Sequence, residues 1–391
     1  MNLFYASFIP GLQNVAASVI KERLAPDVRI LKLLDGAVLF ETETGYDKLN
    51  FFCFNNIFAV INVMDEHGTA DNERRSDNLA ALEKHIKTIV NIKPHSHAKE
   101  KNIILKTQSN SVVYLNPLLN NSKSFNTFRV VFSDENKPAS VNEKFRLDVE
   151  RFISRISGLK VNRSLPDTEF WFLFRREDEK KQMADNVFQE ENGRESKNFS
   201  VFMKRLTLHS SREKTLHRGE LPPPLAWAMC RLGNLKHSDT VLDPFCGYGS
   251  IPETAFKHFH ITEFIACDNN GEASGYTAAR FKKREKHGLI LHKNDFIDLP
   301  LLLGEKSVDA IITDPPWGHF KVNDDIFPVK MFDVFGKLLK DGGRAVVLYA
   351  NENDFLKAVP CCFELQEKIP ILLSGRKAVI YKFILRGSPA G

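Results

Sequence analysis

The stretch of sequence that most constrains this chain covers residues 241–250 and reads VLDPFCGYGS. Its apolar run ends at Asp243, and a Gly-x-Gly turn follows at Gly247 and Gly249. A helical pattern begins at Ser250. In doubly wound folds a first parallel strand leads into a first helix in this way, and glycines let the backbone approach a ligand at the strand end. The stretch therefore predicts such a fold with a nucleotide-like ligand.

A second stretch, residues 311–318, reads IITDPPWG and again ends an apolar strand in an acid. The Asp314 carboxylate and the Pro315 carbonyl can accept hydrogen bonds from both N–H groups of an exocyclic amine on a nucleobase. These bonds localise a lone pair that is otherwise delocalised into the ring, and Trp317 offers a face for the base to stack on. A tight turn beside a core tryptophan would explain the prolines but not the flanking acid and ring. We predict that the catalytic residues are Asp314, Pro315, Pro316 and Trp317.

The C-terminal half alternates strand and helix patterns after the glycine turn. Helical runs separate strand-like runs at residues 263–267, 289–291, 308–313 and 345–349. Such alternation predicts a parallel sheet with helices on both faces. Residues 362–385 contain two strand-like runs about Ser374-Gly375 and predict a terminal antiparallel hairpin.

Two further acids come after predicted strands of this half. Asp268 follows Gly249 at about the 20-residue distance at which an acid accepts hydrogen bonds from ribose hydroxyls in nucleotide-binding units. Asp295 follows the third strand, where it could accept from an adenine amino group while Phe296 lies against the ring. Acids also cap helices for structural reasons. Because both acids stand in register with the glycine turn, we predict that they bind the ligand.

The N-terminal half reads as a smaller α+β arrangement. Asp35-Gly36 is a dipeptide typical of hairpin turns, and strand-like runs flank it at residues 28–33 and 37–41. Most of the 31 phenylalanines of the chain fall inside periodic segments, and we interpret them as core residues. Further strand-like or helical runs lie at residues 3–9, 12–24, 128–132, 145–156 and 169–175.

Composition limits the class of protein. The 391 residues are enough for two or three domains, and a net charge of +5 permits a nucleic-acid partner without requiring one. Six cysteines without metal-ligand or disulfide spacing indicate a reducing compartment. The chain starts without a signal-peptide pattern and has no apolar run of membrane-spanning length, so we expect a cytoplasmic protein and no membrane partner. His95 and His97 lack partner cysteines, and we expect no metal.

Together, DPFCGYGS and DPPWG resemble the motifs of S-adenosylmethionine-dependent amino-methyltransferases. The upstream segments IPGLQNVAASVIKERL, FRVVFS and SLPDTEFWFLFRRE resemble the THUMP-containing RNA guanine-N2 methyltransferases. This resemblance covers nearly the whole chain, with two specific catalytic motifs and a looser N-terminal match. It implies methylation of a guanine 2-amino group in structured RNA, with tRNA as the expected substrate and the THUMP domain on its acceptor end.

The resemblance also implies an α/β architecture. A C-terminal Rossmann-like class I methyltransferase domain follows α+β ferredoxin-like and THUMP domains. The implied boundaries are a ferredoxin-like domain at residues 1–66, a THUMP-like RNA-binding domain at 67–176, a basic linker at 177–218 and the methyltransferase domain at 219–391.

Carried over to this sequence, the family's roles assign Asp314 and Pro315 to the target amine and Trp317 to the base. Many members carry Asn in place of Asp314 and Tyr or Phe in place of Trp317, which leaves open the base that the pocket prefers. Cys246 stands in the donor loop, where a small side chain packs, and we do not expect it to be a nucleophile. The residues implied to bind S-adenosylmethionine are Pro223, Asp243, Phe245, Cys246, Gly247, Gly249, Asp268, Asn269, Asp295 and Phe296.

Basic residues gather in two places. Arg151 and Arg155 lie in the helical run 145–156, where a solvated helix face is the plain alternative to a phosphate contact. The most basic stretch runs from about residue 202 to residue 218, and we predict that RNA phosphates follow it. The predicted RNA-binding residues are Arg151, Arg155, Lys204, Arg205, Arg212, Lys214 and Arg218.

Two alternatives stay open at this point. An adenine-N6 methyltransferase acting on RNA or DNA would use the same acid-Pro-Pro-aromatic motif, although a DNA enzyme would not need a THUMP-like module. A non-catalytic RNA-binding or assembly protein could keep a vestigial methyltransferase fold. The intact Gly247, Gly249 and Asp314 count against this second alternative, because a protein without a donor would be free to lose them.

Overall fold

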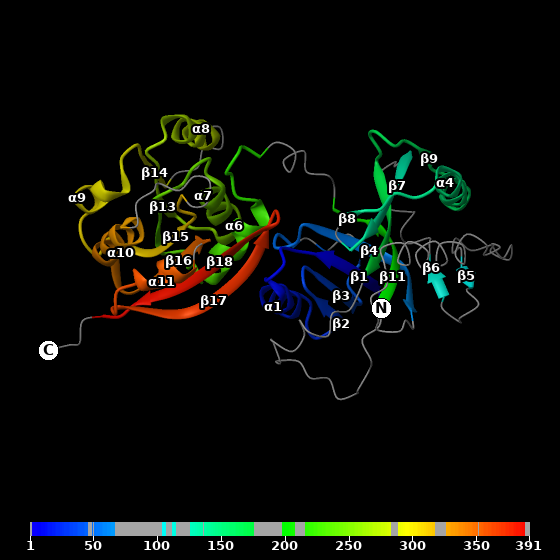
Figure 1. Ribbon diagram of the computed structural model, residues 1–391, viewed down its shortest axis with the longest axis horizontal. Coiled ribbons are helices and arrows are strands. Elements are labelled where there is room, and N and C mark those ends of the chain that lie inside the picture. The colour runs from blue at the N-terminus through cyan, green and yellow to red at the C-terminus, as the bar shows by residue number, and fades with distance from the viewer. Residues whose placement is uncertain are drawn as a thin grey trace. The chain divides into compact units, whose positions relative to one another are not determined.

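The computed structural model describes residues 2–45, 49, 51–66, 104–106, 112–114, 126–135, 137–175, 198–207, 216–282, 288–316, 326–350 and 352–387. The chain divides into two compact units, and each is described by itself (Figure 1). The N-terminal unit comprises residues 1–7, 17–50 and 56–208, and the C-terminal unit comprises residues 8–16, 51–55 and 209–391.

A mixed sheet of nine strands forms the centre of the N-terminal unit. Eight strands follow the order β2-β3-β1-β4-β11-β10-β7-β8, and β9 pairs with β7. A separate antiparallel pair, β5 and β6, has its own sheet. The elements are β1 (Asn2–Ser7), α1 (Gln13–Leu24), β2 (Val28–Leu34), β3 (Ala37–Thr42), β4 (Asn56–Glu66), β5 (Ile104–Lys106), β6 (Val112–Tyr114), β7 (Thr127–Asp134), β8 (Lys137–Pro138), α4 (Glu143–Ser157), β9 (Lys160–Val161), β10 (Thr168–Arg175) and β11 (Asn198–Arg205).

The hairpin predicted about Asp35-Gly36 is confirmed. Strands β2 and β3 pair antiparallel, with Leu34 opposite Ala37. Gly36 has a φ of 79°, a conformation that glycine adopts without a steric cost. The turn residue therefore sets the register of the pair.

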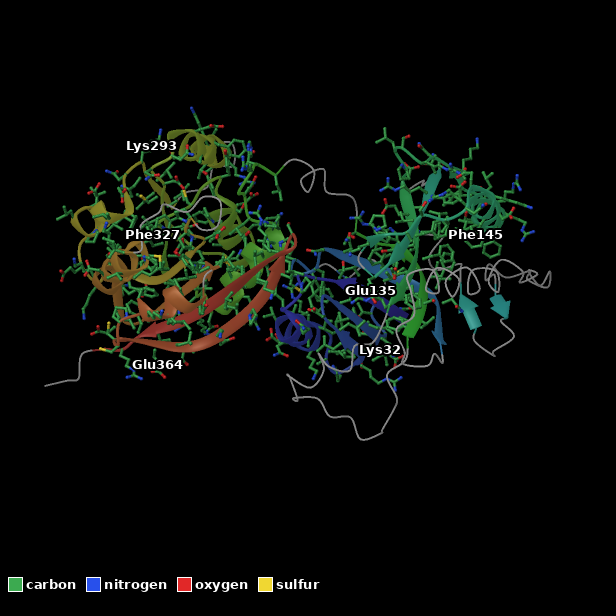
Figure 2. All side chains as sticks on the ribbon, viewed as in Figure 1. Lys32, Glu135, Phe145, Lys293, Phe327 and Glu364 are labelled. Carbon is green, nitrogen blue, oxygen red and sulfur yellow. The ribbon has the colours of Figure 1, made fainter. Side chains whose placement is uncertain are left out.

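Phenylalanine rings form much of the core of the N-terminal unit, as the sequence predicts. Phe132, Phe170, Phe172 and Phe202 come from three neighbouring strands and are buried. Phe172 stacks on Phe202 with 4.3 Å between ring centroids. Phe145 of α4, labelled in Figure 2, lies 6.1 Å from the Phe132 ring. Phe145 thus adds one aromatic contact between helix α4 and the sheet, worth about 0.5–1.5 kcal/mol beyond area burial.

Strand β11 corrects the predicted linker. The sequence predicts a connecting segment over residues 177–218, but residues 198–205 pair antiparallel with both β4 and β10. The prediction was wrong there because basic residues obscured an alternation in which Phe199, Val201 and Met203 are buried on one face. Since β4 belongs to the expected ferredoxin-like domain and β10 to the expected THUMP-like domain, β11 also joins these two parts in one sheet.

A sheet of seven strands in the order β14-β13-β12-β15-β16-β18-β17 forms the centre of the C-terminal unit. The first five run parallel, and β18 runs antiparallel to both β16 and β17. The chain enters at β12 and later crosses back to β15, so the doubly wound prediction is confirmed. The elements are α6 (Pro223–Leu232), β12 (Thr240–Asp243), α7 (Ser250–Thr254), η1 (Ala255–Phe259), β13 (Glu263–Cys267), α8 (Gly271–Lys282), β14 (Leu289–His292), η2 (Phe296–Asp298), α9 (Leu299–Leu303), β15 (Val308–Thr313), α10 (Phe327–Leu338), β16 (Leu339–Tyr349), α11 (Glu352–Lys357), β17 (Phe363–Leu373) and β18 (Arg376–Leu385).

The predicted terminal hairpin is also confirmed. Strands β17 and β18, the long orange and red arrows in Figure 1, pair along their length with Leu373 opposite Arg376. Ser374 and Gly375 make the turn with φ values of 49° and 81°. Both values lie in the left-handed region that short loops between antiparallel strands require.

Helix α6 begins at a run of three prolines, residues 222–224. Pro222 precedes the helix and Pro223 is its first residue, a position at which the missing proline N–H removes no helical hydrogen bond. Leu225, Met229 and Leu232 are buried, as their spacing predicts. One face of α6 is therefore packed in the core, and the chain continues from this helix to β12.

Three further observations bear on the expected class of protein. All six cysteines are free. Among the described residues, no helix is both long and apolar enough to cross a bilayer. The described residues also contain no group of three or more His, Cys, Asp or Glu side chains placed to share a metal ion. His95 and His97 lie outside the described residues.

Candidate active site

Three acids meet at one edge of the sheet of the C-terminal unit. Asp243 ends β12, Asp268 follows β13 and Asp314 follows β15. These strands are parallel neighbours, with Asp243 opposite Ala266 and Leu242 opposite Ile311. The carboxyl ends of parallel strands share one edge, so the three carboxylates converge where doubly wound folds bind their ligands.

Asp243 is almost fully buried at this edge. Its Oδ1 accepts a hydrogen bond from the Thr313 hydroxyl (2.7 Å) and one from the Phe245 N–H (3.2 Å). Burial raises the pKa of Asp243 to about 8, although both hydrogen bonds lower it, and the charges of Asp268 and Asp314 raise it further. The carboxyl is therefore largely neutral at pH 7 when no cation lies beside it.

This shift predicts how stability depends on pH. The pKa of Asp243 rises from 3.8 to about 8 on folding, so the folded state binds the extra proton between these values. Its contribution is complete below pH 4 and is lost as the pH rises to about 8. Asp243→Asn does not titrate at this position. We therefore expect the Tm of this variant, measured relative to the Tm of the wild type, to be higher at pH 9 than at pH 5. Scanning calorimetry without ligand measures this difference; an equal Tm difference at both pH values would contradict the assignment.

The two glycines of the turn have different surroundings. Gly247 has a φ of 50°, and a Cβ added there would meet no atom within 4 Å. Gly249 has a φ of 81°, and its Cβ would lie 2.9 Å from Thr277 Oγ1 on α8. Gly247 therefore leaves room for a ligand, whereas Gly249 is required for close packing of the turn on a helix.

Asp268 is tied to the glycine turn. Its Oδ2 accepts from the Gly247 N–H (2.7 Å), and its Oδ1 accepts from the Asn270 N–H (2.8 Å). Asn269 is exposed beside it. Asp295 caps η2 by accepting from the Ile297 N–H (3.1 Å). Both acids thus have structural partners and also stand at the strand ends that a bound nucleoside would face.

An aromatic cluster borders the same edge. Phe245 and Phe296 lie 4.9 Å apart between ring centroids, and Phe327, labelled in Figure 2, lies 5.7 Å and 5.5 Å from these two rings. Phe296 and Phe327 are buried, and Phe245 is partly exposed. Phe245 is therefore the member of the cluster that a ligand can reach.

Cys246 is a packing residue in this site. It is buried, and its backbone N–H donates to the Cys267 carbonyl (2.9 Å). Burial and the charge of Asp243 raise the pKa of its thiol far above the usual range. Because the thiolate is the nucleophilic form, this cysteine is not activated for attack.

The structure describes the first three residues of the predicted catalytic motif. Asp314 is partly exposed, Pro315 is buried and Pro316 is partly buried. Trp317 lies outside the described residues. Pro223, predicted to border the donor, is the partly buried first residue of α6.

The predicted RNA-binding residues separate into three groups. Arg151, Arg155 and Arg218 are exposed. Lys204 and Arg205 are buried on β11. Their predicted role is corrected, because a buried side chain cannot contact an RNA phosphate. Burial lowers the pKa of Lys204 to about 8, and Arg205 pairs with buried Glu169 at 3.2 Å. Arg212 and Lys214 lie outside the described residues.

Sequence reasoning missed two residues of this site. Thr313 connects the two motifs, because it precedes Asp314 and its hydroxyl binds Asp243. The parallel pairing of β12 with β15 would have placed them together if the strand register had been known. Phe327 is the first residue of α10, and no signal in the sequence marks its contact with Phe245 and Phe296.

A family model matches the C-terminal part of the chain. Residues 211–368 match the family model described as UPF0020, RMKL-like, methyltransferase domain. This match covers the glycine turn, Asp268, Asp295 and the Asp314 motif. The match thus contains strands β12 to β16 of the C-terminal unit and the start of β17.

Two similar proteins carry names of guanine-N2 methyltransferases. The U6 snRNA (guanine-N(2))-methyltransferase THUMPD2 of Bos taurus is 35% identical over 133 residues, which are 33% of this chain and 25% of the relative. The tRNA (guanine(10)-N2)-dimethyltransferase of Methanocaldococcus jannaschii is 28% identical over 211 residues, 52% of this chain and 56% of the relative. The alignments thus cover between a quarter and about half of these relatives' own lengths.

A solved structure shows the same fold along nearly the whole chain. TrmN from Thermus thermophilus superposes with a TM-score of 0.68 at 19% identity, over 98% of this chain and all of that chain. The class I methyltransferase fold predicted for the C-terminal part is confirmed. The resemblance to the THUMP-containing guanine-N2 methyltransferases is confirmed by the named relatives.

Proposed function

We propose that this chain is an S-adenosylmethionine-dependent methyltransferase that forms N2-methylguanosine in structured RNA, with tRNA as its substrate. The observation that carries the proposal is the hydrogen bond from Thr313 to Asp243, which joins the ends of β12 and β15. It places the glycine turn of one motif beside Asp314 of the other. A donor site and an amine-holding site on adjacent strands are what direct methyl transfer requires.

The residues of the donor side suit a cationic ligand with an adenosine group. Gly247 leaves space next to the backbone, and the Asp268 and Asp295 carboxylates can accept hydrogen bonds from ribose and adenine. Phe245 offers an apolar ring beside Phe296. S-Adenosylmethionine supplies an activated methyl group on a positively charged sulfur when it is bound. A positive charge beside Asp243 favours its ionised form, so we expect donor binding to release a proton.

The acceptor side acts through Asp314 and Pro315. The carboxylate and the backbone carbonyl accept hydrogen bonds from the guanine 2-amino group and orient its lone pair toward the methyl group. When the nitrogen gains a methyl group it carries one proton too many, and the Asp314 carboxylate can accept that proton.

RNA is the partner that the N-terminal unit favours. Arg151 and Arg155 are exposed on α4, and Arg155 lies over the Phe152 ring at 5.9 Å. Arg151 also pairs with Asp148 at 3.3 Å, an exposed pair that a phosphate can replace at small cost. The named relatives act on tRNA and U6 snRNA, which supports an RNA substrate.

A cytoplasmic location is part of the proposal. Six free cysteines, four of them buried, suit a compartment that keeps thiols reduced. Neither a metal nor a membrane has a role in the proposed reaction.

Donor binding tests the proposed function. We expect titration calorimetry to show that the wild type binds S-adenosylmethionine and that Asp243→Ala binds it about tenfold more weakly or worse, because the variant removes the carboxylate and its bond to Thr313. Asp298→Ala, at an exposed acid on η2, is the matched control and should bind like the wild type. No binding by the wild type, or equal binding by Asp243→Ala, contradicts the proposal and favours a non-catalytic protein.

A further inference from the structure

One arginine outside the predicted site connects three segments that border the proposed donor site. Arg280 lies on α8 and its side chain is mostly buried. Its guanidinium donates to the Tyr248 carbonyl in the glycine turn (2.5 Å) and to Glu220 Oε1 ahead of α6 (3.1 Å). Its Nε pairs with Glu253 Oε2 on α7 at 2.9 Å. A planar guanidinium with a rigid fork of donors suits three partners in one place, which a lysine cannot match.

The two acids around Arg280 depend on it. The side chains of Glu220 and Glu253 are each only 4% exposed. Two buried carboxylates without a cation would repel each other and lose their solvation. Removal of the guanidinium should therefore drive Glu220 and Glu253 apart and shift the segments that carry them.

Helix α8 holds two consecutive carbonyl groups of the glycine turn. Thr277 donates to the Gly247 carbonyl (2.9 Å), and Arg280 donates to the next carbonyl, that of Tyr248. A trans peptide directs its N–H opposite to its C=O. With the Gly247 carbonyl turned to α8, the Tyr248 N–H points away from the helix. The Thr277 contact therefore fixes the direction of the Tyr248 N–H, and the Arg280 contact holds the next peptide, whose Gly249 N–H donates to the Cys246 carbonyl.

Glu220 fastens a second segment to the same turn. Its Oε2 accepts from the His217 N–H (3.1 Å), and its Oε1 accepts from the Ser250 hydroxyl (3.2 Å). The His217 ring stacks on the Tyr248 ring, with 4.1 Å between centroids and 7° between planes. The residues that lead to Pro223 are thus held against the glycine turn by a carboxylate and by a ring contact.

We infer that Arg280 is a positioning residue for the methyl donor, because it sets the spacing between the segment that leads to Pro223 and the glycine turn. The inference rests on the proposed function. Arg280 does not need to touch the donor; it acts through the Tyr248 carbonyl and Glu220. The contribution of Arg280 should appear in donor affinity and only weakly in the transfer step.

Variants of Arg280 test the inference. We expect Arg280→Met to raise the Kd for S-adenosylhomocysteine about tenfold or more, since small displacements in a preorganised site cost this much. Arg280→Lys keeps the charge but loses the fork and should lie between Arg280→Met and the wild type. Lys282→Met, at an exposed position of the same helix, is the matched control and should bind like the wild type. The turnover number at saturating donor should stay within about threefold of the wild type, while the KM for the donor rises.

The outcomes separate this inference from the proposed function. If the wild type binds S-adenosylhomocysteine and Arg280→Met, folded by its melting curve, binds it equally well, the positioning role is wrong and the proposed function stands. If the wild type itself does not bind, the proposed function is wrong. If Arg280→Met does not fold, Glu220→Gln takes its place: it keeps the shape and removes one charge, and an unchanged Kd in that variant overturns the inference.

Discussion

Replacement of Asp314 by alanine is expected to lower the rate of methyl transfer roughly 100- to 1,000-fold, the usual effect of removing one preorganised polar group from a transition state. The Kd for the donor should stay within about threefold, because the proposed donor site lies on the β12 side and Asp314 follows β15. Single-turnover transfer of labelled methyl groups measures the first quantity, and titration calorimetry measures the second.

Asp314→Asn is the matched variant for this prediction. Asparagine keeps an oxygen that accepts a hydrogen bond but has no charge, and many members of the resembled family carry it at this position. We expect Asp314→Asn to retain far more transfer than Asp314→Ala. Transfer by Asp314→Ala at the wild-type rate would move the catalytic centre away from this strand end.

Reversal of the charge at Arg205 is expected to destabilise the N-terminal unit rather than to weaken RNA binding alone. Arg205→Glu would place a second carboxylate beside Glu169, whose side chain is 2% exposed. Loss of one partner of a buried ion pair costs about 3–5 kcal/mol, and a like charge adds to this cost. Glu169 also accepts from Arg129 (2.7 Å) and Trp171 (2.9 Å), so these contacts should be disturbed as well. Scanning calorimetry should show an earlier transition for this unit.

Arg151→Glu is the control for that result. The Arg151 side chain is 75% exposed, so its replacement should leave the Tm almost unchanged. It should weaken RNA binding and reduce the slope of log K against log salt concentration by about one. If Arg205→Glu melts like the wild type and Arg151→Glu does not affect RNA binding, the division of the basic residues into buried and phosphate-binding groups is wrong.

The strand ends of the C-terminal unit could be predicted because each motif contains the residues that end its strand. Asp243 and Asp314 each follow an apolar run, and glycine or proline stops the strand directly afterwards. Local signals of this kind do not depend on distant contacts. Asp268 was predicted as a ligand from its spacing, while its bond to the Gly247 N–H was not, because that bond depends on how far β13 extends.

Strand β11 shows why the basic stretch was misinterpreted. Lys204 and Arg205 look like surface residues because charges are rarely buried. Their burial depends on Glu169, which lies 36 residues from Arg205 in the sequence and reaches it only through the pairing of β10 with β11. A partner so distant in sequence gives no local signal. The same reason explains why Thr313 and Arg280 were not predicted as parts of the donor site.

The most direct test of the account is to incubate the full chain with labelled S-adenosylmethionine and total tRNA or total ribosomal RNA, and then to identify the labelled nucleoside. We predict N2-methylguanosine in tRNA, together with loss of the label in Asp314→Ala. N6-methyladenosine as the product would contradict the guanine assignment and favour the adenine-N6 alternative. Absence of label from both RNA pools, in a preparation that binds the donor, would contradict the proposed RNA substrate.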